Sequence, residues 1–277
     1  MPPDPHTAVR QELLVRYLDF WVPSALHSAR AATYLDRSGS GPAAALPVLV
    51  EFADLLVGRK LSVLVGGPMP PDPRLPGLRL APAPADLPGL VAGLRREPVL
   101  AHLDGPVPAE LLAALGAAHD GELLLVTPPE PGDPRAELRA AGFGYVAAVE
   151  LVDAAGAAQL LRFASSGGRS LERFKDELWA VDQYAGIGYR DPADPDAEPL
   201  EITYEPHPGP LRRAVLTRLA AAGPQTVTEL RELALTGTVY RPADIGRALS
   251  PLLARGQVAR EPERGRLTGA TLIRLPG

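Results

Sequence analysis

Residues 31–67 constrain the fold more than any other stretch, because they have the pattern of a strand, a glycine turn, a helix and a second strand. In chain order these are residues 31–35, Asp36 with the turn glycines Gly39 and Gly41, residues 43–57, and residues 61–65. Short apolar runs of this kind are typical of buried strands. A parallel strand–helix–strand unit with an acid and glycines at its first turn is the usual seat of a nucleotide-like ligand.

The same alternation of strands and helices continues after this unit. It predicts a mainly parallel sheet with helices on both faces. Two late runs, 145–152 and 159–164, have the spacing of a hairpin and allow one antiparallel strand at the sheet edge. A leading amphipathic helix is expected from residue 8 to about residue 22, with its end or a kink at Pro23. We therefore predict an α/β, Rossmann-like domain over residues 1–185.

The remainder of the chain has a different character. Residues 186–208 are rich in proline and aspartate, which indicates a linker, with a short strand at 200–204 as an open alternative. Residues 209–277 have the pattern of three helices and a hairpin, which predicts a winged helix, a variant of the helix-turn-helix. Pro251 conflicts with a straight third helix, because it removes one backbone hydrogen bond.

Charge is distributed unevenly along the chain. The net charge is −5, but residues 209–277 hold 11 arginines and 5 acidic residues, a balance of +6, which leaves −11 for residues 1–208. A basic tail on an acidic body favours a polyanionic partner, although attraction between the two halves explains it equally well. We therefore predict duplex DNA phosphates, or alternatively an acidic protein surface, as the partner of four tail arginines: Arg241, Arg247, Arg264 and Arg266.

Several classes of function are disfavoured by what the sequence lacks. The chain has no cysteine, which excludes disulfides and thiolate metal sites of its own. Its five histidines show no metal-ligand spacing, so no metal is expected. No apolar stretch is long enough for a bilayer, and the first residues do not resemble a signal peptide, so we expect a cytoplasmic protein with no membrane partner.

Four short segments together resemble the three-Cys-motif partner (TcmP) family, in which a methyltransferase-like fold precedes a winged-helix region. They are the leading helix at 12–21, the strand end Tyr34-Leu35-Asp36 with its glycine turn, the strand at 99–106, and the amphipathic segment at 174–182 with its Lys, Trp and Val-Asp signature. The resemblance implies S-adenosylmethionine as the ancestral cofactor. It also implies a radical S-adenosylmethionine enzyme, which carries the three cysteines, as the partner.

The sequence departs from a working methyltransferase where such enzymes hold cofactor and substrate. The second strand is followed by Gly66 where an acid commonly holds the cofactor ribose. The fourth strand ends Leu103-Asp104-Gly105-Pro106, without the usual proline and aromatic residue. Asp36, Gly39, Gly41 and Gly66 are therefore either a cofactor site or its vestige, and we favour the vestige. Asp104 is a candidate catalytic residue or the cap of a helix beginning near Pro108, and we favour the cap.

These observations lead to one expectation and two alternatives. We expect a non-catalytic, methyltransferase-like partner or regulatory protein with a winged helix, acting with a nucleic-acid-modifying or radical S-adenosylmethionine enzyme and holding no cofactor. The first alternative is an active S-adenosylmethionine-dependent methyltransferase. The second is a transcription regulator whose pocket senses a small molecule.

Overall fold

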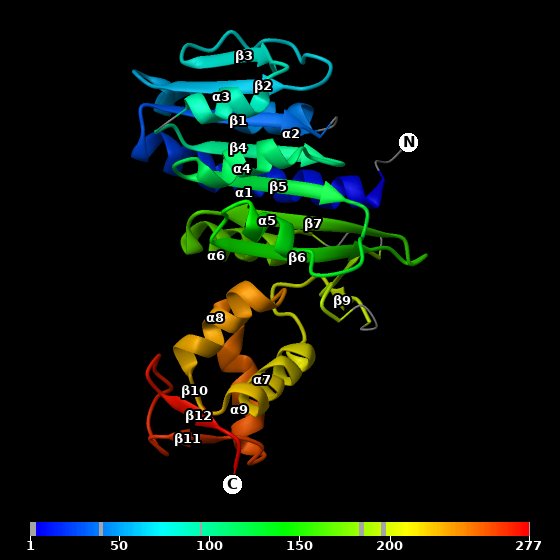
Figure 1. Cartoon of the computed structure of the whole chain (residues 1–277), viewed down its shortest axis with the longest axis vertical. Coiled ribbons are helices and arrows are strands. Elements are labelled where there is room, and N and C mark those ends of the chain that lie inside the picture. The colour runs from blue at the N-terminus through cyan, green and yellow to red at the C-terminus, as the bar shows by residue number, and fades with distance from the viewer. Residues whose placement is uncertain (1–3, 39–40, 95, 183–185, 195–197, 277) are drawn as a thin grey trace. The chain divides into compact units, whose positions relative to one another are not determined.

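The chain divides into two compact units, which are described separately here. The computed structural model describes residues 4–38, 41–94, 96–182, 186–194 and 198–276 (Figure 1). The first unit spans Met1–Thr203 and the second spans Tyr204–Gly277.

The first unit is built on one large sheet, nine-stranded within the described residues. Its strands are β1 (Ala31–Arg37), β2 (Lys60–Val65), β3 (Leu78–Pro82), β4 (Val99–Asp104), β5 (Gly121–Thr127), β6 (Tyr145–Val152), β7 (Ala158–Ser165), β8 (Gly188–Arg190) and β9 (Leu200–Glu201). Their order across the sheet is β3-β2-β1-β4-β5-β7-β6-β8-β9, and the pairs from β3 to β5 are all parallel. This is a doubly wound, Rossmann-like order with a reversed strand beside β5. The predicted fold class of this unit is confirmed.

The reversed strand does not lie at the sheet edge, where the sequence led us to expect it. β7 is inserted between β5 and β6 and is antiparallel to both. The hairpin turn at Asp153 brings the chain back along β6, and β7 pairs with β6 through one edge and with β5 through the other. The edge position is taken instead by β8 and β9, which continue the sheet beyond β6.

The expected linker at 186–208 is wrong for its first part, because β8 and β9 belong to the sheet. Gly188 to Arg190 pair with Val152 to Glu150 on β6. Tyr189 is fully buried and donates a hydrogen bond from its hydroxyl to the Leu178 carbonyl. Burial of this aromatic ring outweighs the turn-forming prolines and aspartates around it, which is why composition alone misled us.

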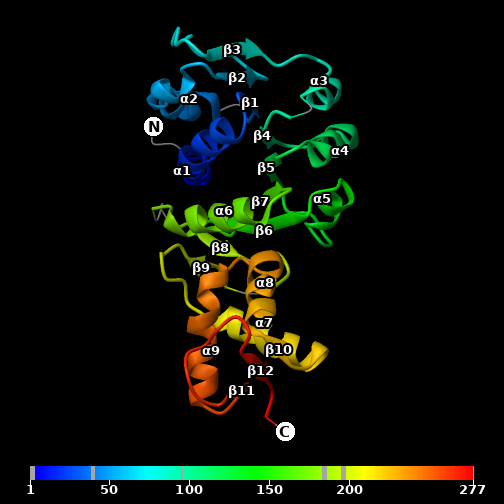
Figure 2. The ribbon, with the colours of Figure 1, turned by 90° about the vertical axis from the view of Figure 1, so that its left-hand side faces the viewer.

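Helices cover both faces of the sheet, as the alternation predicted. They are α1 (Pro5–Ser28), α2 (Gly41–Glu51), the 3₁₀ turn η1 (Ala53–Leu56), α3 (Leu87–Gly93), α4 (Ala109–Ala117), α5 (Ala136–Ala140) and α6 (Gly168–Ala180). Figure 2 shows α1, α2 and α6 on one face and α3, α4 and α5 on the other. None of the helices in the described parts of the chain combines the length and apolar character needed to cross a bilayer.

α1 continues past Pro23, where we expected its end or a kink, and reaches Ser28. Proline deprives the carbonyl four residues earlier, that of Asp19, of its helical partner. Asp19 is exposed, so water can satisfy that carbonyl. Beyond Pro23, Ala25 and Leu26 are buried and hold the last turns of the helix against the unit.

The two faces of the sheet differ in chemistry. The face under α3, α4 and α5 is aliphatic, with buried Leu35, Ala101, Leu103, Leu123 and Leu125 in one continuous cluster. Strand side chains alternate between faces. The intervening residues, which lie under α1, α2 and α6, therefore carry the polar groups of the sheet: Tyr34, Asp36, His102, Asp104 and Glu122.

The second unit contains helices and a small sheet. The helices are α7 (Gly209–Ala222), α8 (Val227–Gly237), the 3₁₀ turn η2 (Pro242–Asp244) and α9 (Ile245–Ala254), and the strands are β10 (Gln225–Thr226), β11 (Ala259–Glu261) and β12 (Leu272–Arg274). The strands form an antiparallel sheet in the order β10-β12-β11. Thr226 and Glu229 form a capping box at the start of α8. Pro251 lies inside α9 without ending it.

Candidate functional site

The candidate site lies where β1 and β4 end side by side. Chain connections leave this point in opposite directions, β1 leading toward β2 and β4 toward β5. Ligands of open α/β sheets bind at such a switch point, beyond the carboxyl ends of the strands. Asp36 of β1 is in register with His102 of β4, so both side chains lie on the same face. The structure thus brings Asp36 to the position that the sequence assigned to it.

The Asp36 carboxylate is occupied by groups of the protein itself. Its Oδ2 accepts a hydrogen bond from the Tyr34 hydroxyl and lies 3.2 Å from Nδ1 of His102. Its Oδ1 accepts from the Ser38 amide at 2.9 Å and from the Ser38 hydroxyl at 2.7 Å. The residue is only 1% exposed. Both oxygens of the carboxylate therefore have internal partners.

These contacts also determine the charge of the site. Burial by itself raises the pKa of the Asp36 carboxyl, but His102, the Tyr34 hydroxyl and the Ser38 amide together lower it below its usual 3.8. Burial and the neighbouring Asp36 charge raise the pKa of Tyr34 well above its usual value. At neutral pH the cluster is thus a buried anion that accepts hydrogen bonds from its neighbours.

Helix α2 begins directly on this carboxylate. Gly41, its first residue, donates its amide hydrogen to the Ser38 hydroxyl at 2.9 Å. A helix N-terminus attracts an anion through its free amides and its dipole. Here Asp36 lies at that place, where a ligand phosphate or carboxylate would bind in a nucleotide-binding protein. Gly39, the other turn glycine we singled out, lies outside the described residues.

Replacing Gly41 with alanine is expected to destabilise the first unit by about 1–3 kcal/mol, because the added methyl group overpacks the site. That carbon would overlap Oδ2 of Asp36 and Oγ of Ser38 and would lie 2.7 Å from Nδ1 of His102. Chemical denaturation measures the loss. Gly93→Ala in α3 is the matched control, since an added carbon there meets nothing within 4 Å. Equal stability of the two variants would contradict the close packing of α2 on Asp36.

Gly66 follows β2 and links the ends of two neighbouring strands. Its amide donates to the Asp36 carbonyl at 2.8 Å, which joins the ends of β1 and β2. An added Cβ at Gly66 would overlap Cγ of Arg37, so the glycine makes room for that arginine side chain. No carboxylate stands at this position to hold a ribose.

Asp104 is not the helix cap that we favoured from the sequence, because its carboxylate forms an ion pair instead. Its Oδ2 accepts a hydrogen bond from Nη1 of Arg10 in α1 at 2.9 Å, an ion pair that crosses from β4 to the leading helix. It does not cap α4, whose N-cap is Pro108 and has no side-chain cap. The long-range ion pair could not be read from local spacing, because 94 residues separate the two partners.

His102 is a buried histidine on β4, and one of its two ring nitrogens has a partner. It is 4% exposed, its Nδ1 faces Asp36, and its Nε2 has no hydrogen-bond partner among the described residues. Within those residues the structure also contains no group of three or more histidine, aspartate or glutamate side chains arranged to hold a metal ion.

Sequence reasoning missed a second buried carboxyl group on the same face. Glu122 of β5 accepts a hydrogen bond from the Tyr17 hydroxyl of α1 at 2.6 Å. Burial raises the pKa of the Glu122 carboxyl from 4.5 to about 7, although hydrogen bonds with Ser170 and Tyr17 act in the opposite direction. The one signal in the sequence was a single acid at the start of the apolar run 123–126.

The four tail arginines fall into two pairs with different surroundings. Arg241 is 6% exposed, and its guanidinium binds both carboxylate oxygens of Asp244 and the Tyr204 carbonyl. Arg247 also faces Asp244, at 3.5 Å, and donates to the Pro206 carbonyl. The prediction that Arg241 contacts phosphates is therefore wrong, because its guanidinium is buried and paired. The i,i+3 spacing to Asp244 was the signal for that pair.

Arg264 and Arg266 are exposed on the loop between β11 and β12. The loop is held by Arg260, whose guanidinium donates to the carbonyls of Pro262 and Gly265, each at 2.9 Å. The structure therefore separates these two arginines from Arg241 and Arg247, and it presents them on a braced loop.

Comparison with known proteins gives low similarities. No protein-family model matches the sequence, and no curated protein does. A crystal structure of EvdMO1 is 18% identical with a TM-score of 0.35, over 58% of this chain and 42% of that one, so this chain spans less than half of EvdMO1. A predicted O-methyltransferase from Agrobacterium tumefaciens is 19% identical with a TM-score of 0.31, over 57% of this chain and 80% of that one. A 16S rRNA (adenine(1408)-N(1))-methyltransferase mutant from Catenulisporales acidiphilia is 16% identical with a TM-score of 0.32, over 61% of this chain and 95% of that one.

Proposed function

We propose that this chain is a non-catalytic, methyltransferase-like protein that serves as a partner or regulatory subunit of another enzyme. The observation that carries the proposal is that the Asp36 carboxylate is buried and already has partners within the protein. Its two oxygens contact Tyr34, His102 and Ser38. To bind a cofactor, the carboxylate would have to give up these partners, and breaking buried hydrogen bonds costs free energy.

The substrate side of the sheet supports the same proposal. Catalysis by Asp104 would need its carboxylate free to face a substrate amine or hydroxyl. Instead Arg10 holds it at 2.9 Å, and the arginine is mostly buried while Asp104 is about one third exposed. α1 thus supplies the counter-charge at the end of β4. A methyltransferase would need both the cofactor side and the substrate side to open.

The proposal predicts that S-adenosylmethionine does not stabilise the full-length protein. A ligand present at 100 times its dissociation constant adds about 2.7 kcal/mol of stability. For a unit of this size that corresponds to a rise in melting temperature of roughly 5–11 °C. We expect no rise in a thermal melt with 1 mM S-adenosylmethionine. A rise of several degrees would support the active methyltransferase instead.

We further propose that the second unit is a winged helix, with the β11–β12 loop as the wing. The order of its elements supports this: helix, strand, two helices, then two strands joined by the braced loop. The outward residues of α9, Gly246, Ser250 and Ala254, offer one hydroxyl and no charge for reading base edges. We therefore expect duplex DNA to be held through phosphate contacts rather than base contacts, with the exposed Arg264 and Arg266 of the wing as the contacts to test.

Replacing both Arg264 and Arg266 with alanine is expected to weaken duplex binding and to lower the slope of log K against log salt by about 1.8, because each phosphate contact contributes about 0.9. Fluorescence anisotropy across a salt series measures both effects. The double variant Arg79→Ala and Arg96→Ala in the first unit is the matched control, since both arginines are exposed and the charge change is equal.

A full-length protein with no duplex affinity at low salt would contradict a DNA-binding wing. It would favour an acidic protein surface as the partner of Arg264 and Arg266. We then propose as that partner the radical S-adenosylmethionine enzyme that the family resemblance implies, and co-purification of the two chains would be the next measurement.

A further inference from the structure

A small cavity opens near the amino ends of the central strands β4 and β5, at the opposite end of these strands from the candidate site. It has a volume of about 140 Å³ and is lined by the second half of α1, the residues entering β4 and β5, and the junction of β7 with α6. Pro98 precedes β4 and Asp120 precedes β5, so the cavity lies at the amino ends of the parallel strands. It therefore lies apart from Asp36 and Asp104, which stand at the carboxyl ends.

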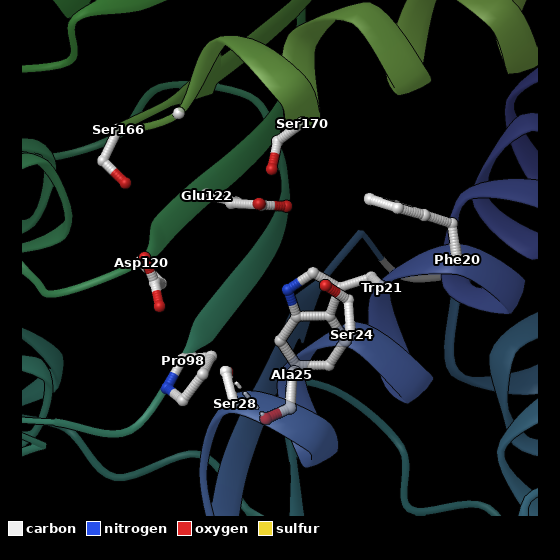
Figure 3. Close-up of a pocket in the computed structure, with 11 residues that line it drawn as sticks. Phe20, Trp21, Ser24, Ala25, Ser28, Pro98, Asp120, Glu122, Ser166 and Ser170 are labelled. Atoms are coloured by element: carbon white, nitrogen blue, oxygen red, sulfur yellow. Dashed lines mark hydrogen bonds between the residues drawn. The ribbon is translucent and has the colours of Figure 1, made fainter.

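The lining of this cavity combines carboxyl groups, hydroxyl groups and aromatic rings. Figure 3 shows Glu122 and Ser170 facing the rings of Phe20 and Trp21 across the opening, with Asp120 beside them. The lining residues include no lysine, arginine or histidine, and the nearby guanidinium of Arg173 lies over the Phe20 ring, 5.6 Å from its centroid. Carboxylates and ring faces both attract cations, and a ring can contribute about 0.5–2 kcal/mol to such binding. The chemistry of the cavity is thus suited to a positively charged group.

Glu122 is the deepest acidic group of the lining. It is 6% exposed, and Tyr17 and Ser170 already provide hydrogen bonds to it. Because its pKa is about 7, the carboxyl is about half neutral at pH 7. A cation placed in the cavity would favour the ionised form and would release the proton. Binding of a cation should therefore strengthen as the pH rises.

We infer that this cavity binds a small organic cation with a primary ammonium group, held by the carboxyl groups of Glu122 and Asp120 and packed against Trp21 and Phe20. A metal ion is a poorer fit, because the described residues contain no set of three or more ligating side chains. The size sets a limit, since an apolar cavity of about 150 Å³ holds benzene, so the ligand has roughly five to eight non-hydrogen atoms. This inference does not depend on the proposed function.

The test uses butylammonium as the probe. Butyrate and 1-butanol, which have the same chain length but a negative charge and no charge respectively, are the control compounds. Calorimetry on the full-length protein at pH 6 and pH 8, with ionic strength held constant by sodium chloride, gives each dissociation constant. We expect butylammonium to bind about tenfold more tightly at pH 8, because the ionised fraction of a group with a pKa of about 7 rises from about one tenth to about nine tenths.

Two variants locate the site. Glu122→Gln keeps the shape of the side chain but removes the charge, and it should abolish both the binding and its pH dependence. Asp120→Asn should weaken binding severalfold. Glu110→Gln, on the opposite face of the sheet in α4, removes the same charge and should leave binding unchanged. Equal binding of butyrate or 1-butanol, retained binding in the Glu122→Gln variant, or no binding of any probe would overturn the inference.

Discussion

Truncation of Phe174 to alanine is expected to lower the free energy of unfolding of the first unit by about 3–5 kcal/mol. Phe174 lies on α6, is 1% exposed, and stacks on Phe163 of β7 with ring centroids 4.4 Å apart. It also contacts Tyr17 of α1 edge-on, at 6.0 Å. One ring therefore joins α6, α1 and the sheet, and its removal would leave a cavity among three elements that cannot all close in.

Urea denaturation measures this loss as a shift of the midpoint at unchanged slope. Val57→Ala is the control, because Val57 is 78% exposed and its truncation should change stability by no more than about 0.5 kcal/mol. A midpoint for the Phe174→Ala variant equal to that of the control would mean that α6 does not pack on the sheet as described.

The second large effect is expected from Glu122→Gln and depends on pH. The pKa of Glu122 is about 7 in the folded protein and near 4.5 without burial. The folded state therefore binds more protons than the unfolded state between these values, so stability falls as the pH rises from about 4.5 through 7. Above pH 7 the free energy of unfolding is lower by the full amount, roughly 3 kcal/mol, since a difference of one pKa unit corresponds to about 1.36 kcal/mol.

Glutamine is neutral at all these pH values and avoids that loss. We expect Glu122→Gln to be more stable than the natural protein at pH 8, by as much as roughly 3 kcal/mol, and to differ little at pH 4.5. Denaturation curves at both pH values measure the difference, with Glu110→Gln as the control that should show no such dependence. A Glu122→Gln variant that is less stable at pH 8 would contradict the account in which burial raises the pKa of Glu122 despite its hydrogen bonds with Tyr17 and Ser170.

Each acid on the face of the sheet under α1 has a partner, and two of these acids, Asp36 and Glu122, are buried while Asp104 is about one third exposed. Arg10 of α1 pairs with Asp104, and Tyr17 of the same helix donates to Glu122. His102 and Tyr34 do the same for Asp36 from within the sheet. A buried carboxylate without partners is costly, so the leading helix and the sheet must form together.

The sequence predicted the alternation of strands and helices and the place of Asp36, because both follow from local patterns. Short apolar runs, glycine turns and helix periodicity are encoded within about ten residues of each other. The sheet order between β5 and β8 was not predictable in this way. It depends on the tertiary pairing of the β6–β7 hairpin with β5 and of β8 with β6. Tyr189, which is buried on β8, lies in a segment whose composition indicates a linker.

The chemistry of the site was harder to predict than the fold. His102 meets Asp36 across 66 residues of sequence, and Tyr17 meets Glu122 across 105. Such pairs follow from strand register and helix placement, which a single sequence does not specify. Asp244 and Arg241 are the instructive exception, because their spacing of three residues is a local signal of an ion pair.

The central claim is that Asp36 and its neighbours form a closed cluster that does not accept S-adenosylmethionine. Calorimetric titration of the full-length protein tests it most directly. Two temperatures are needed, because the heat of binding changes with temperature and cannot vanish at both. We predict no saturable heat at either temperature up to millimolar S-adenosylmethionine. A saturable isotherm with a micromolar dissociation constant would contradict the claim and would favour the alternative function, an active S-adenosylmethionine-dependent methyltransferase.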